Sequence, residues 1–537
     1  MAGISGLSVT VLEFGAVRFM APWFGQSNYV WSNVIGVILL ALSLGYWLGG
    51  RIADNSTTGR PLYTSYLLAA AWTVVVTVLG PAICAWLVPA DLGSARMLPL
   101  AFTGSLAATL LLFAPPVLVL GMTSPFLVRL DDAPGRAGRT AGRIFAIGTL
   151  GSLVGCYIAP LWMLQALGSR TTILVCAGAL ALLGALGLMF SARSTTRSAV
   201  AGVLLGLAAL GLGLMGASRP LRVDPGQIEE IESAYQTVRV AAENSWVPVP
   251  TAYPLQYEPR EVMTRFLRHD EDVDTYQSVV LQPPEIAQKL LMGGRYYDHM
   301  ALAAWFARKV QPKTLDVMVI GYAGGSAHRA LAAVLPPGMK LRVLGVEIDP
   351  AVVDIARRHL SMGDLESEGL RLITGEDGRT VVNALPEDEA FDLILVDAYA
   401  KTTFVPFQLA SVECFSKLME HLKPEGRIGL NLHANGGLDG RLYQSIAKTL
   451  SSSDRVGDVW VVPNPWYLGS ILLWAGGPKT GAPRVRGDVT LPAPLRTPAF
   501  ALERLMVRYV PEDERGHVLT DDRSDVDRIT QESFVLR

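Results

Sequence analysis

This chain contains few cysteines and histidines, and its positive and negative charges nearly balance. Four cysteines and seven histidines occur in 537 residues, and the formal net charge is −2. The cysteines, at positions 84, 156, 176 and 414, have no paired spacing and the histidines are scattered, so neither a disulfide framework nor a metal cluster is indicated. No basic block is interleaved with aromatic residues, which argues against nucleic acid as a partner.

Charge is almost missing from the first part of the chain. From Ile4 to Ala217 the sequence is nearly continuously apolar, and it divides into stretches that provide the roughly 20 residues a helix needs to cross a bilayer. Seven spans are predicted, at approximately 4–21, 31–50, 62–88, 98–128, 142–167, 171–190 and 199–217. The first span lacks the basic leader of a signal peptide and carries Glu13 and Arg18. We therefore expect a multi-pass domain of the cell membrane over residues 1–220.

Two patterns inside the apolar part call for an explanation. Small residues recur at four-residue spacing, as Ala41, Gly45 and Gly49 and as Gly151, Gly155 and Ala159, which predicts closely packed helix pairs. Ionisable groups such as Glu13 and Arg18 cost roughly 2.5–3.5 kcal/mol in hydrocarbon. Either these residues have a structural role, as an ion pair or with Arg18 snorkelled to the interface, or they belong to a polar pathway or site.

The stretch Val317–Ser326 (VMVIGYAGGS) has the pattern of an apolar strand that runs into a glycine-rich turn and a helix. A second strand ends on Glu347, at about the twenty-residue distance that nucleoside-binding sheets use. Gly321, Gly324 and Gly325 let the backbone turn sharply and approach a ligand, and Glu347 is placed to accept hydrogen bonds from two ribose hydroxyls. An adenosyl ligand is predicted, and the alternative is a tight turn with no ligand.

An α/β sheet is predicted around this turn. Strands are expected at about 315–320, 341–347, 370–374, 391–397 and 427–432, with helices at 327–335, 350–360 and 407–422. This alternation implies a parallel sheet that binds ligands at the carboxyl ends of its strands. Asp377 and Asp397 follow the third and fourth strands, so we expect them to converge with Glu347 on one crevice. A small β layer is expected from the alternating stretch 232–240, and a closing hairpin from 458–474.

Short motifs follow one another between positions 232 and 522: ESAYQTVRV, RYYDHM, VMVIGYAGGSAHRAL, VEID, EDGR, DLILVDAY and LTDD. Their order resembles that of spermidine synthases, the polyamine aminopropyltransferases. With its apolar first part, the chain resembles the membrane-fused spermidine-synthase-like proteins of bacteria over nearly its whole length. The resemblance implies a helical membrane bundle at 1–220, a small β-rich segment at 221–300 and a Rossmann-like domain of the S-adenosylmethionine methyltransferase type at 301–537.

The resemblance also implies roles for particular residues. Asp397 matches the family's catalytic aspartate, which could deprotonate or orient an attacking amine. Gln236 is placed near the aminopropyl or methionine-derived tail, Glu347 at the ribose hydroxyls, and Asp377 with Gly378 at the adenine edge. The candidate substrate contacts are Tyr297, Asp298, His299 and Tyr399. The structural alternatives are helix capping for Asp397, a strand-face hydrogen bond for Gln236 and a turn role for Asp377.

The chain departs from the family pattern in three places. The glycine turn has no aspartate to hold the donor's amino group, Ala400 stands where a second aspartate is expected, and Tyr297-Asp298-His299 replaces Tyr-His-Glu. Because a buried ammonium needs a charge partner, these losses weaken the case for putrescine and decarboxylated S-adenosylmethionine. Asp298 and His299 are candidates to compensate from a neighbouring segment.

Three hypotheses about function remain. The first is a membrane-anchored aminopropyltransferase that uses decarboxylated S-adenosylmethionine as co-substrate, with Asp397 as general base toward a small-molecule amine. The second is an S-adenosylmethionine-dependent methyltransferase, or another sulfonium-cleaving enzyme, on the same fold. The third is a nucleoside-sensing membrane protein for binding or transport. The lipid bilayer is the expected surroundings in each case, no metal is expected, and a homodimer is compatible with the resemblance.

Arginines predict the orientation of the membrane spans. Arginines at 51 and 60, at 129, 136, 139 and 143, and at 193 and 197 fall in alternate loops, which places those loops and the amino terminus in the cytoplasm. An odd number of spans then puts the adenosyl-binding domain outside, where such a cofactor is not expected. Either 62–88 or 98–128 is a double or re-entrant span, or Arg219 and Arg222 override the bias. The membrane side of the domain is left open.

Overall fold

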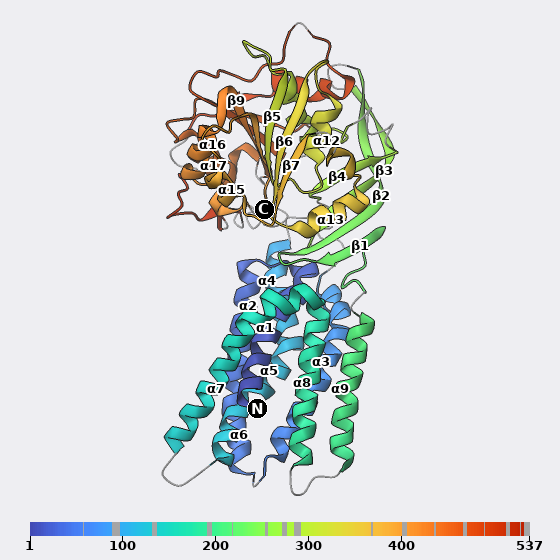
Figure 1. The fold of residues 1–537 in the computed structure, drawn as a ribbon, viewed down its shortest axis with the longest axis vertical. Helices are drawn as coiled ribbons and strands as arrows, with labels where there is room; N and C mark the ends of the chain where they lie inside the picture. The colour runs from blue at the N-terminus through green and yellow to red at the C-terminus, as the bar shows by residue number, and fades with distance from the viewer. Residues whose placement is uncertain are drawn as a thin grey trace. The chain divides into compact units, whose positions relative to one another are not determined.

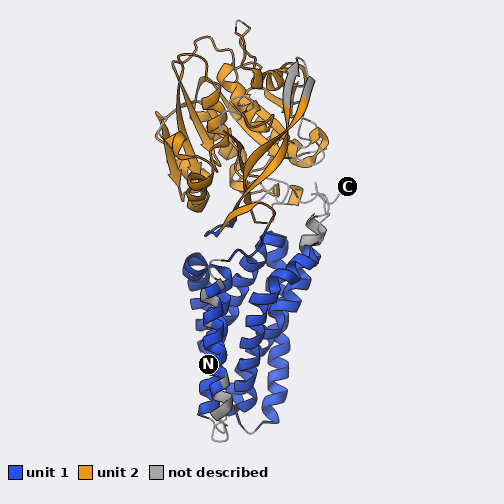
Figure 2. Ribbon diagram, turned by 90° about the vertical axis from the view of Figure 1, so that its right-hand side faces the viewer, with its two compact units in different colours: residues 1–223, 231–237 blue, residues 224–230, 238–537 orange. Residues whose placement is uncertain are grey.

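The chain was examined as a computed structural model. It describes residues 1–56, 58–88, 97–131, 137–190, 196–216, 219–252, 256–270, 276–283, 291–366, 369–399, 405–433, 437–465, 470–487, 489–511, 516–526 and 528–530. These residues form two compact units, Met1–Val223 with Ile231–Thr237 and Asp224–Glu230 with Val238–Arg537 (Figure 2). The chain therefore enters the second unit after residue 223 and returns to the first for residues 231–237.

Helices make up the first unit. They are α1 (Ala2–Phe24), α2 (Asn28–Asp54), α3 (Arg60–Leu87), α4 (Met97–Ala108), η2 (Thr109–Phe113), α5 (Ala114–Gly121), α6 (Thr123–Leu130), α7 (Ala137–Ile158), η3 (Ala159–Met163), α8 (Leu164–Met189) and α9 (Thr196–Gly216) (Figure 1). Five stretches are long and apolar enough to cross a membrane by length and composition, namely Ala2–Phe24, Asn28–Asp54, Arg60–Leu87, Phe102–Leu130 and Gly138–Met189. The last contains the spans expected at 142–167 and 171–190, which are divided at Gly168, where φ is 73°. The span expected at 199–217 lies at α9.

Small residues allow these helices to approach one another closely. Gly45 on α2 faces α5, where a Cβ added to the glycine would lie 2.2 Å from the carbonyl oxygen of Leu118. Gly151 on α7 faces α1, where an added Cβ would lie 1.9 Å from the carbonyl oxygen of Gly3. Backbones that approach so closely gain the dispersion contacts that hold helices together in lipid. The close packing predicted from the small residues is confirmed at both positions.

Polar side chains of the helices hold the segment 231–237. Arg18 on α1 is 7% exposed and donates a hydrogen bond to the carbonyl oxygen of Ser233. Glu232 accepts hydrogen bonds from the amide and the hydroxyl of Ser169 on α8, at 2.9 and 3.1 Å. Within the described residues no ion pair joins Arg18 to the half-buried Glu13. Arg18 therefore has a structural role as a donor to the backbone, and not as the partner of Glu13.

The arginine pattern can be tested with fusion reporters. If it sets the orientation, a reporter fused after Arg197 will report the cytoplasm and one fused after Arg222 will report the opposite side, because α9 lies between the two positions. Activity of alkaline phosphatase and fluorescence of a cytoplasm-dependent reporter would distinguish the two sides. Two reporters on the same side would show that 199–217 does not cross the bilayer.

Two sheets form the second unit. The smaller has the order β1 (Gln227–Glu232), β2 (Thr237–Ala252), β3 (Gln256–His269) and β4 (Ser278–Gln282). The larger consists of β5 (Thr314–Ile320), β6 (Lys340–Glu347), β7 (Leu370–Thr374), β8 (Phe391–Val396), β9 (Leu422–His433), β10 (Val459–Pro463), β11 (Ser470–Gly476) and β12 (Val507–Arg508). The single strand expected at 232–240 is instead split by a turn in which the Ser233 hydroxyl accepts hydrogen bonds from the amides of Tyr235 and Gln236. A hydroxyl that replaces ladder partners in this way favours a turn over a continuous strand.

The helices of the second unit cover both faces of the larger sheet. They are α11 (Tyr296–Ala301), η4 (Leu302–Trp305), α12 (Ser326–Ala333), α13 (Pro350–His359), α14 (Gly363–Glu366), α15 (Gly378–Ala384), η5 (Phe407–Leu409), α16 (Val412–Glu420), η6 (Gly437–Asp439), α17 (Arg441–Ser451), η7 (Ala493–Leu495) and α18 (Arg496–Arg504). Figure 1 shows α12 and α13 on one side of the sheet and α15, α16 and α17 on the other. Every residue of β8 is buried, as expected for a strand covered on both faces.

The larger sheet is mixed, with the strand order β12-β10-β11-β9-β8-β5-β6-β7. The five strands predicted from the sequence, β5 to β9, pair in parallel. The hairpin expected at 458–474 is β10 and β11; it extends the same sheet, because β11 pairs antiparallel with β9 and β10 with β11. Since β5 has β6 on one side and β8 on the other, the strand order reverses between β5 and β8. Open α/β sheets bind ligands outside the carboxyl ends of the strands at such a point.

Candidate active site

The carboxyl ends of β5 and β8 meet at Gly321. The amide of Asp397, directly after β8, donates a hydrogen bond of 2.9 Å to the carbonyl oxygen of Ile320. Gly321 has a φ of 81°, and a Cβ added there would lie 2.4 Å from the carbonyl oxygen of Asp397. A larger residue would push the two strand ends apart. The predicted glycine turn and the predicted catalytic aspartate are therefore neighbours.

The smaller sheet holds the rest of the glycine turn. The amide of Gly324 donates to the hydroxyl of Ser278 on β4, at 2.8 Å. The hydroxyl of Ser326 accepts from the amide of Val279, at 2.9 Å, and donates to the carbonyl oxygen of the same residue, at 3.1 Å. Gly325, in the left-handed conformation with a φ of 77°, is the N-cap of α12. The turn is therefore held by hydrogen bonds to β4 and by the start of α12, without a ligand.

Glu347 ends β6 beside this turn. Its Oε2 accepts a hydrogen bond of 2.8 Å from the amide of Ala323, and its Oε1 accepts one of 3.0 Å from the amide of Asp349. The side chain is 7% exposed, and burial raises its pKa to about 7. Each carboxylate oxygen can accept more than one hydrogen bond. Glu347 thus orders the glycine turn and keeps acceptor capacity for the ribose hydroxyls that the sequence predicts.

Asp377 and Gly378 lie where α15 begins. The Oδ1 of Asp377 accepts hydrogen bonds from the amides of Arg379 and Thr380, at 2.8 and 3.3 Å, and its Oδ2 accepts one of 3.0 Å from Gln408. Asp377 is therefore the N-cap of α15, whereas the alternative given for it from the sequence was a turn role. A Cβ on Gly378 would lie 2.7 Å from the side chain of Ile320, which brings this helix end close to the end of β5. A contact with an adenine edge stays a prediction.

Asp397 is held by two neutral donors. Its Oδ2 accepts a hydrogen bond of 2.9 Å from the hydroxyl of Tyr296, and its Oδ1 accepts one of 2.9 Å from the Nδ2 of Asn431. Burial raises the pKa of the carboxyl to about 7, although both hydrogen bonds act in the opposite direction. A carboxyl with a pKa close to neutrality can take up a proton and release it again at physiological pH. This environment is suited to a general base.

Tyr399 lies next to the same strand ends. Its hydroxyl donates to the carbonyl oxygen of Asn431, at 2.8 Å, and accepts from the amide of His433, at 3.0 Å. Burial raises the pKa of this phenol above its usual value. Tyr399 therefore joins the segment after β8 to the end of β9, and its predicted substrate contact stays a prediction.

The three consecutive candidates Tyr297, Asp298 and His299 all lie on α11. The Tyr297 hydroxyl donates to the carbonyl oxygen of Gln277, at 2.9 Å. Asp298 accepts hydrogen bonds from the amides of Met292 and Gly294, at 3.0 and 2.7 Å, and burial raises its pKa to about 7. Burial lowers the pKa of His299 to about 4, so its ring is neutral at pH 7. Asp298 thus holds the backbone before α11 with both of its oxygens.

Gln236 lies in the turn between β1 and β2. Its carbonyl oxygen accepts hydrogen bonds from the amide and the hydroxyl of Ser233, at 2.8 and 3.0 Å, and the residue is 8% exposed. It belongs to the segment 231–237, which groups with the helical unit. The predicted contact of Gln236 with the donor's tail stays a prediction.

Sequence reasoning missed Tyr296 and Asn431, the two donors to Asp397. Both lie inside recognised stretches, Tyr296 in the RYYDHM motif and Asn431 in the strand expected at 427–432. An asparagine in an otherwise apolar buried strand is unusual, because its amide needs partners there. That mismatch was the available signal for Asn431. Nothing local distinguishes Tyr296 from Tyr297 beside it.

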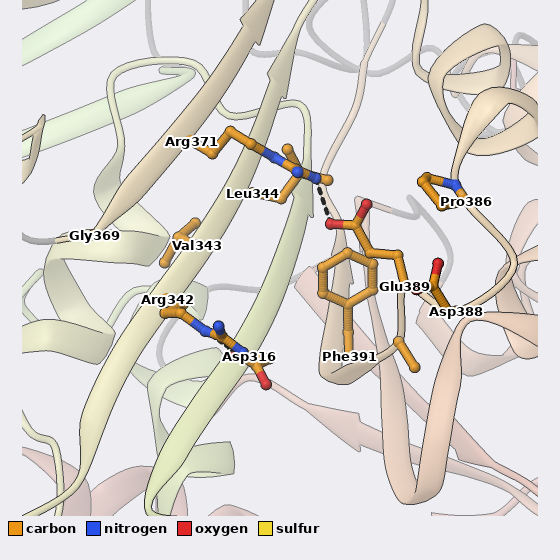
Figure 3. A pocket seen from close by; sticks show the side chains of 11 residues that line it. Asp316, Arg342, Val343, Leu344, Gly369, Arg371, Pro386, Asp388, Glu389 and Phe391 are labelled. Carbon is orange, nitrogen blue, oxygen red and sulfur yellow. Dashed lines mark hydrogen bonds and ion pairs between the residues drawn. The ribbon is translucent and has the colours of Figure 1, made fainter.

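A cavity of about 530 Å³ lies at the amino-terminal ends of the strands, where β6, β7 and β8 begin. It is lined by Asp316, Arg342, Val343, Leu344, Gly369, Arg371, Pro386, Asp388, Glu389, Ala390 and Phe391 (Figure 3). Several charged side chains are paired with each other, as Arg371 is with Glu389. The cavity is separate from Glu347 and Asp397, which stand at the opposite ends of these strands. Across the described ranges, no three His, Cys, Asp or Glu side chains are grouped so that they could hold a metal ion.

Comparison with known proteins identifies sequence relatives, although no family model matches the chain. The chain is 30% identical over 160 residues to a probable polyamine aminopropyl transferase of Bifidobacterium longum, a match that covers 30% of this chain and 32% of the relative. It is 24% identical over 379 residues to polyamine aminopropyltransferase 1 of Streptomyces coelicolor, over 69% of this chain and 66% of the relative. It is 29% identical over 154 residues to the polyamine aminopropyltransferase of Vibrio vulnificus, over 28% and 48%. The chain thus spans less than two thirds of each relative.

Solved structures with some likeness to the chain include two spermidine synthases. One is a probable spermidine synthase from Corynebacterium glutamicum, with 16% sequence identity and a TM-score of 0.38 over 57% of this chain and 99% of that one. The other is the enzyme from Thermotoga maritima, with 14% identity and a TM-score of 0.34 over 48% and 74%. The sequence relatives therefore show similarity to polyamine aminopropyltransferases over parts of the chain.

Proposed function

We propose that the chain is a membrane-anchored transferase that moves an aminopropyl group from decarboxylated S-adenosylmethionine to an amine acceptor. The observation that carries the proposal is the position of Asp397. Its carboxylate lies directly after β8, beside the glycine turn, and is oriented by Tyr296 and Asn431. The names of the sequence relatives support the same reaction class. The helices of apolar composition support the anchoring.

For this reaction the protein has to align the acceptor nitrogen with the donor carbon and to remove one proton from the nitrogen. The lone pair of the acceptor nitrogen attacks the methylene carbon bonded to the donor's sulfonium. A carbon–nitrogen bond forms, the carbon–sulfur bond breaks, and its electron pair neutralises the sulfur, so that methylthioadenosine leaves. The nitrogen then carries a surplus proton, which Asp397 takes up. Holding the amine in line with the breaking bond contributes the rest of the acceleration.

The donor would be held by the groups at the ends of β5, β6 and α15. Glu347 would accept hydrogen bonds from the ribose hydroxyls, and the amides of the glycine turn would lie against the nucleoside. Asp377 with Gly378 would lie at the adenine edge, and Gln236 near the donor's tail. The buried position of Glu347 against the turn supports this arrangement, because both are already fixed to each other by a 2.8 Å hydrogen bond.

Methyl transfer from S-adenosylmethionine is the second candidate. One observation favours it: the turn Gly321–Ser326 contains no carboxylate, so nothing in that turn matches the free amino group of a decarboxylated donor. Such a reaction would need alignment of the methyl group with the acceptor and would depend less on a base at Asp397.

Calorimetry on the full-length protein in detergent would separate the two candidates at the level of binding. The three titrants are decarboxylated S-adenosylmethionine, S-adenosylmethionine and methylthioadenosine. Aminopropyl transfer predicts that the decarboxylated donor binds more tightly than S-adenosylmethionine, with methylthioadenosine also bound. Tighter binding of S-adenosylmethionine would favour methyl transfer.

The proposal predicts a pH dependence of the rate. A base acts only when it is deprotonated, and burial raises the pKa of Asp397 to about 7. The kcat/KM with a saturating donor is therefore expected to rise as the pH increases through about 7 and to be low below it. Tyr296→Phe removes a hydrogen bond that favours the carboxylate, so the rise should move to higher pH. A flat profile over the neutral range in wild type and variant alike would rule out Asp397 as the titrating base.

A further inference from the structure

A second cavity lies in the helical unit, where three helix ends meet. Its volume is about 390 Å³, which is within the range of sites that bind small molecules. α2 ends at Asp54, α6 ends at Leu130 and α7 begins at Ala137, and α6 contacts both of the other helices. The residues that line it include Tyr46, Gly50 and Asp54 of α2, Arg129 of α6 and Phe145 of α7. We call it the helix-end cavity.

The helix-end cavity carries charges of both signs at the helix ends. Asp54 is the last residue of α2, and Arg129 lies in the last turn of α6. Both residues are exposed. Each one stands where an apolar stretch long enough to cross a bilayer comes to its end, so in a membrane they would lie at the level of the lipid headgroups. An arginine matches a phosphate and a carboxylate matches an ammonium, and a zwitterionic headgroup has both.

The cavity continues from these charges along an aromatic surface. Tyr46 stands two turns before Asp54, about 12 Å along the helix. It is 44% exposed, and Phe145 on α7 is 52% exposed. Beside Tyr46, the guanidinium of Arg51 lies 4.1 Å from the centroid of the Trp47 ring, and such aromatic and basic residues are typical of membrane interfaces. The helix-end cavity thus has a charged end and an apolar end, as a phospholipid does.

Gly50 leaves the space between the two ends open. A Cβ added to it would meet no atom of the described residues within 4 Å. The neighbouring Gly49 differs, because a Cβ added there would lie 2.6 Å from the Cα of Met122. Glycine is less favourable than alanine inside a helix. Helix packing accounts for Gly49, whereas Gly50 keeps room in the cavity.

We propose that the helix-end cavity binds one phospholipid with a primary-amine headgroup, phosphatidylethanolamine. Its phosphate accepts from Arg129, its ammonium donates to the carboxylate of Asp54, and the start of an acyl chain follows Tyr46 and Phe145. The inference rests on the proposed membrane anchoring and is independent of the group that the enzyme transfers. A choline headgroup has the same charges but no N–H to donate, and a glycerol headgroup has no ammonium.

Native mass spectrometry of the full-length protein in detergent tests the choice of lipid. Phosphatidylethanolamine, phosphatidylcholine and phosphatidylglycerol with identical acyl chains are titrated in turn. Phosphatidylethanolamine is expected to bind about tenfold more tightly than the other two, the effect of one hydrogen bond between charged groups. Equal binding of the three lipids would overturn the proposal. Free phosphoethanolamine that competes as well as the lipid would also overturn it, because the ligand would then be a soluble molecule.

The anchoring on which the inference rests is tested separately. Membranes that contain the protein are washed with carbonate, which removes peripheral proteins. Protein that stays in the washed membranes but shows no lipid preference would overturn the lipid site alone. Protein that leaves the membranes would overturn the anchoring and the lipid site together.

A glycine pair tests the position of the lipid. Gly50→Leu should fill the cavity without displacing backbone, so the bound phosphatidylethanolamine should be lost. Gly36→Leu is the matched control, since an added Cβ there also meets no described atom within 4 Å and Gly36 does not line the cavity. The two variants should melt at the same temperature, because neither leucine has to push other atoms aside. If both retain the lipid equally, the lipid binds elsewhere.

A second pair tests the headgroup contact. Asp54→Asn keeps the size of the side chain and removes its charge, so the preference for phosphatidylethanolamine over phosphatidylcholine should fall by about tenfold. Asp131→Asn is the control, the same substitution at an exposed residue directly after α6 that does not line the cavity. It should keep the preference. An Asp54→Asn variant with the wild-type preference would show that Asp54 does not contact the ammonium.

Discussion

Replacing Asp397 by asparagine is expected to lower turnover by about 10²–10⁴-fold, the usual contribution of a general base. The substitution keeps the size of the side chain and removes the group that takes the proton. The amide can still accept the hydrogen bond of Tyr296, which spans 2.9 Å in the wild type. Donor binding should therefore survive, and the loss should appear in kcat at saturating donor and acceptor. Single-turnover kinetics would measure it without interference from product release.

The matched control is Asp388→Asn. It is the same substitution at an exposed residue, which lines the cavity at the amino-terminal ends of the strands. It should leave turnover unchanged. An Asp397→Asn variant that binds the donor and turns over as fast as this control would remove the base from the mechanism. Transfer by alignment alone would then be favoured, as in methyl transfer.

Glu347→Gln is expected to weaken binding of decarboxylated S-adenosylmethionine and methylthioadenosine by tenfold or more. A hydrogen bond to a charged group is worth about 1.5–3 kcal/mol, and glutamine lacks that charge. In addition, glutamine has one acceptor oxygen where Glu347 uses two, for the amides of Ala323 and Asp349. The glycine turn would then lose one of its supports. Calorimetry with each nucleoside measures the effect.

Loss of folding has to be separated from loss of the ribose contact. The melting temperature of Glu347→Gln should be recorded beside that of Glu387→Gln, an exposed position outside the site. A 2′-deoxy analogue of the nucleoside offers a second check, because it lacks one of the hydroxyls assigned to Glu347. If wild type and Glu347→Gln both bind the ribose nucleoside equally tightly, Glu347 is not part of the site.

The parallel core of the second unit could be predicted because its strands are buried on both faces. Strands such as Thr314–Ile320 and Phe391–Val396 are short, largely apolar runs that end before a glycine or a carboxylate, and their bounds agree with the expected ranges to within one residue. The helix Arg441–Ser451 was not predicted. Its Leu442, Ile446 and Leu450 recur at four-residue spacing and form an apolar stripe that packs into the core. That stripe was a usable signal.

One local feature was missed in the sequence. The Ser233 hydroxyl splits the expected strand at 232–240 by accepting from nearby amides. The break at Gly168, where φ is 73°, falls between the spans predicted at 142–167 and 171–190, so the division of this apolar stretch was predicted. In the first unit, composition predicts the long apolar helices, five of which are long and apolar enough to cross a membrane.

In the candidate site, too, some residues could be predicted from the sequence and others could not. Glu347 and Asp397 could be predicted because carboxylates that follow apolar strands stand at the ligand-binding edge of the sheet. Their partners could not, because Tyr296 and Asn431 reach Asp397 from 101 and 34 residues away in the chain. Asn431 is brought to Asp397 by the pairing of β8 with β9, and Tyr296 by the packing of the helix α11.

The most direct test of the account is to identify the group that is transferred. Full-length protein in detergent is incubated with an amine and either decarboxylated S-adenosylmethionine or S-adenosylmethionine, and the products are identified by mass spectrometry. The account predicts that the amine gains one aminopropyl group and that methylthioadenosine is released, with the decarboxylated donor only. An amine that gains a methyl group from S-adenosylmethionine would contradict it.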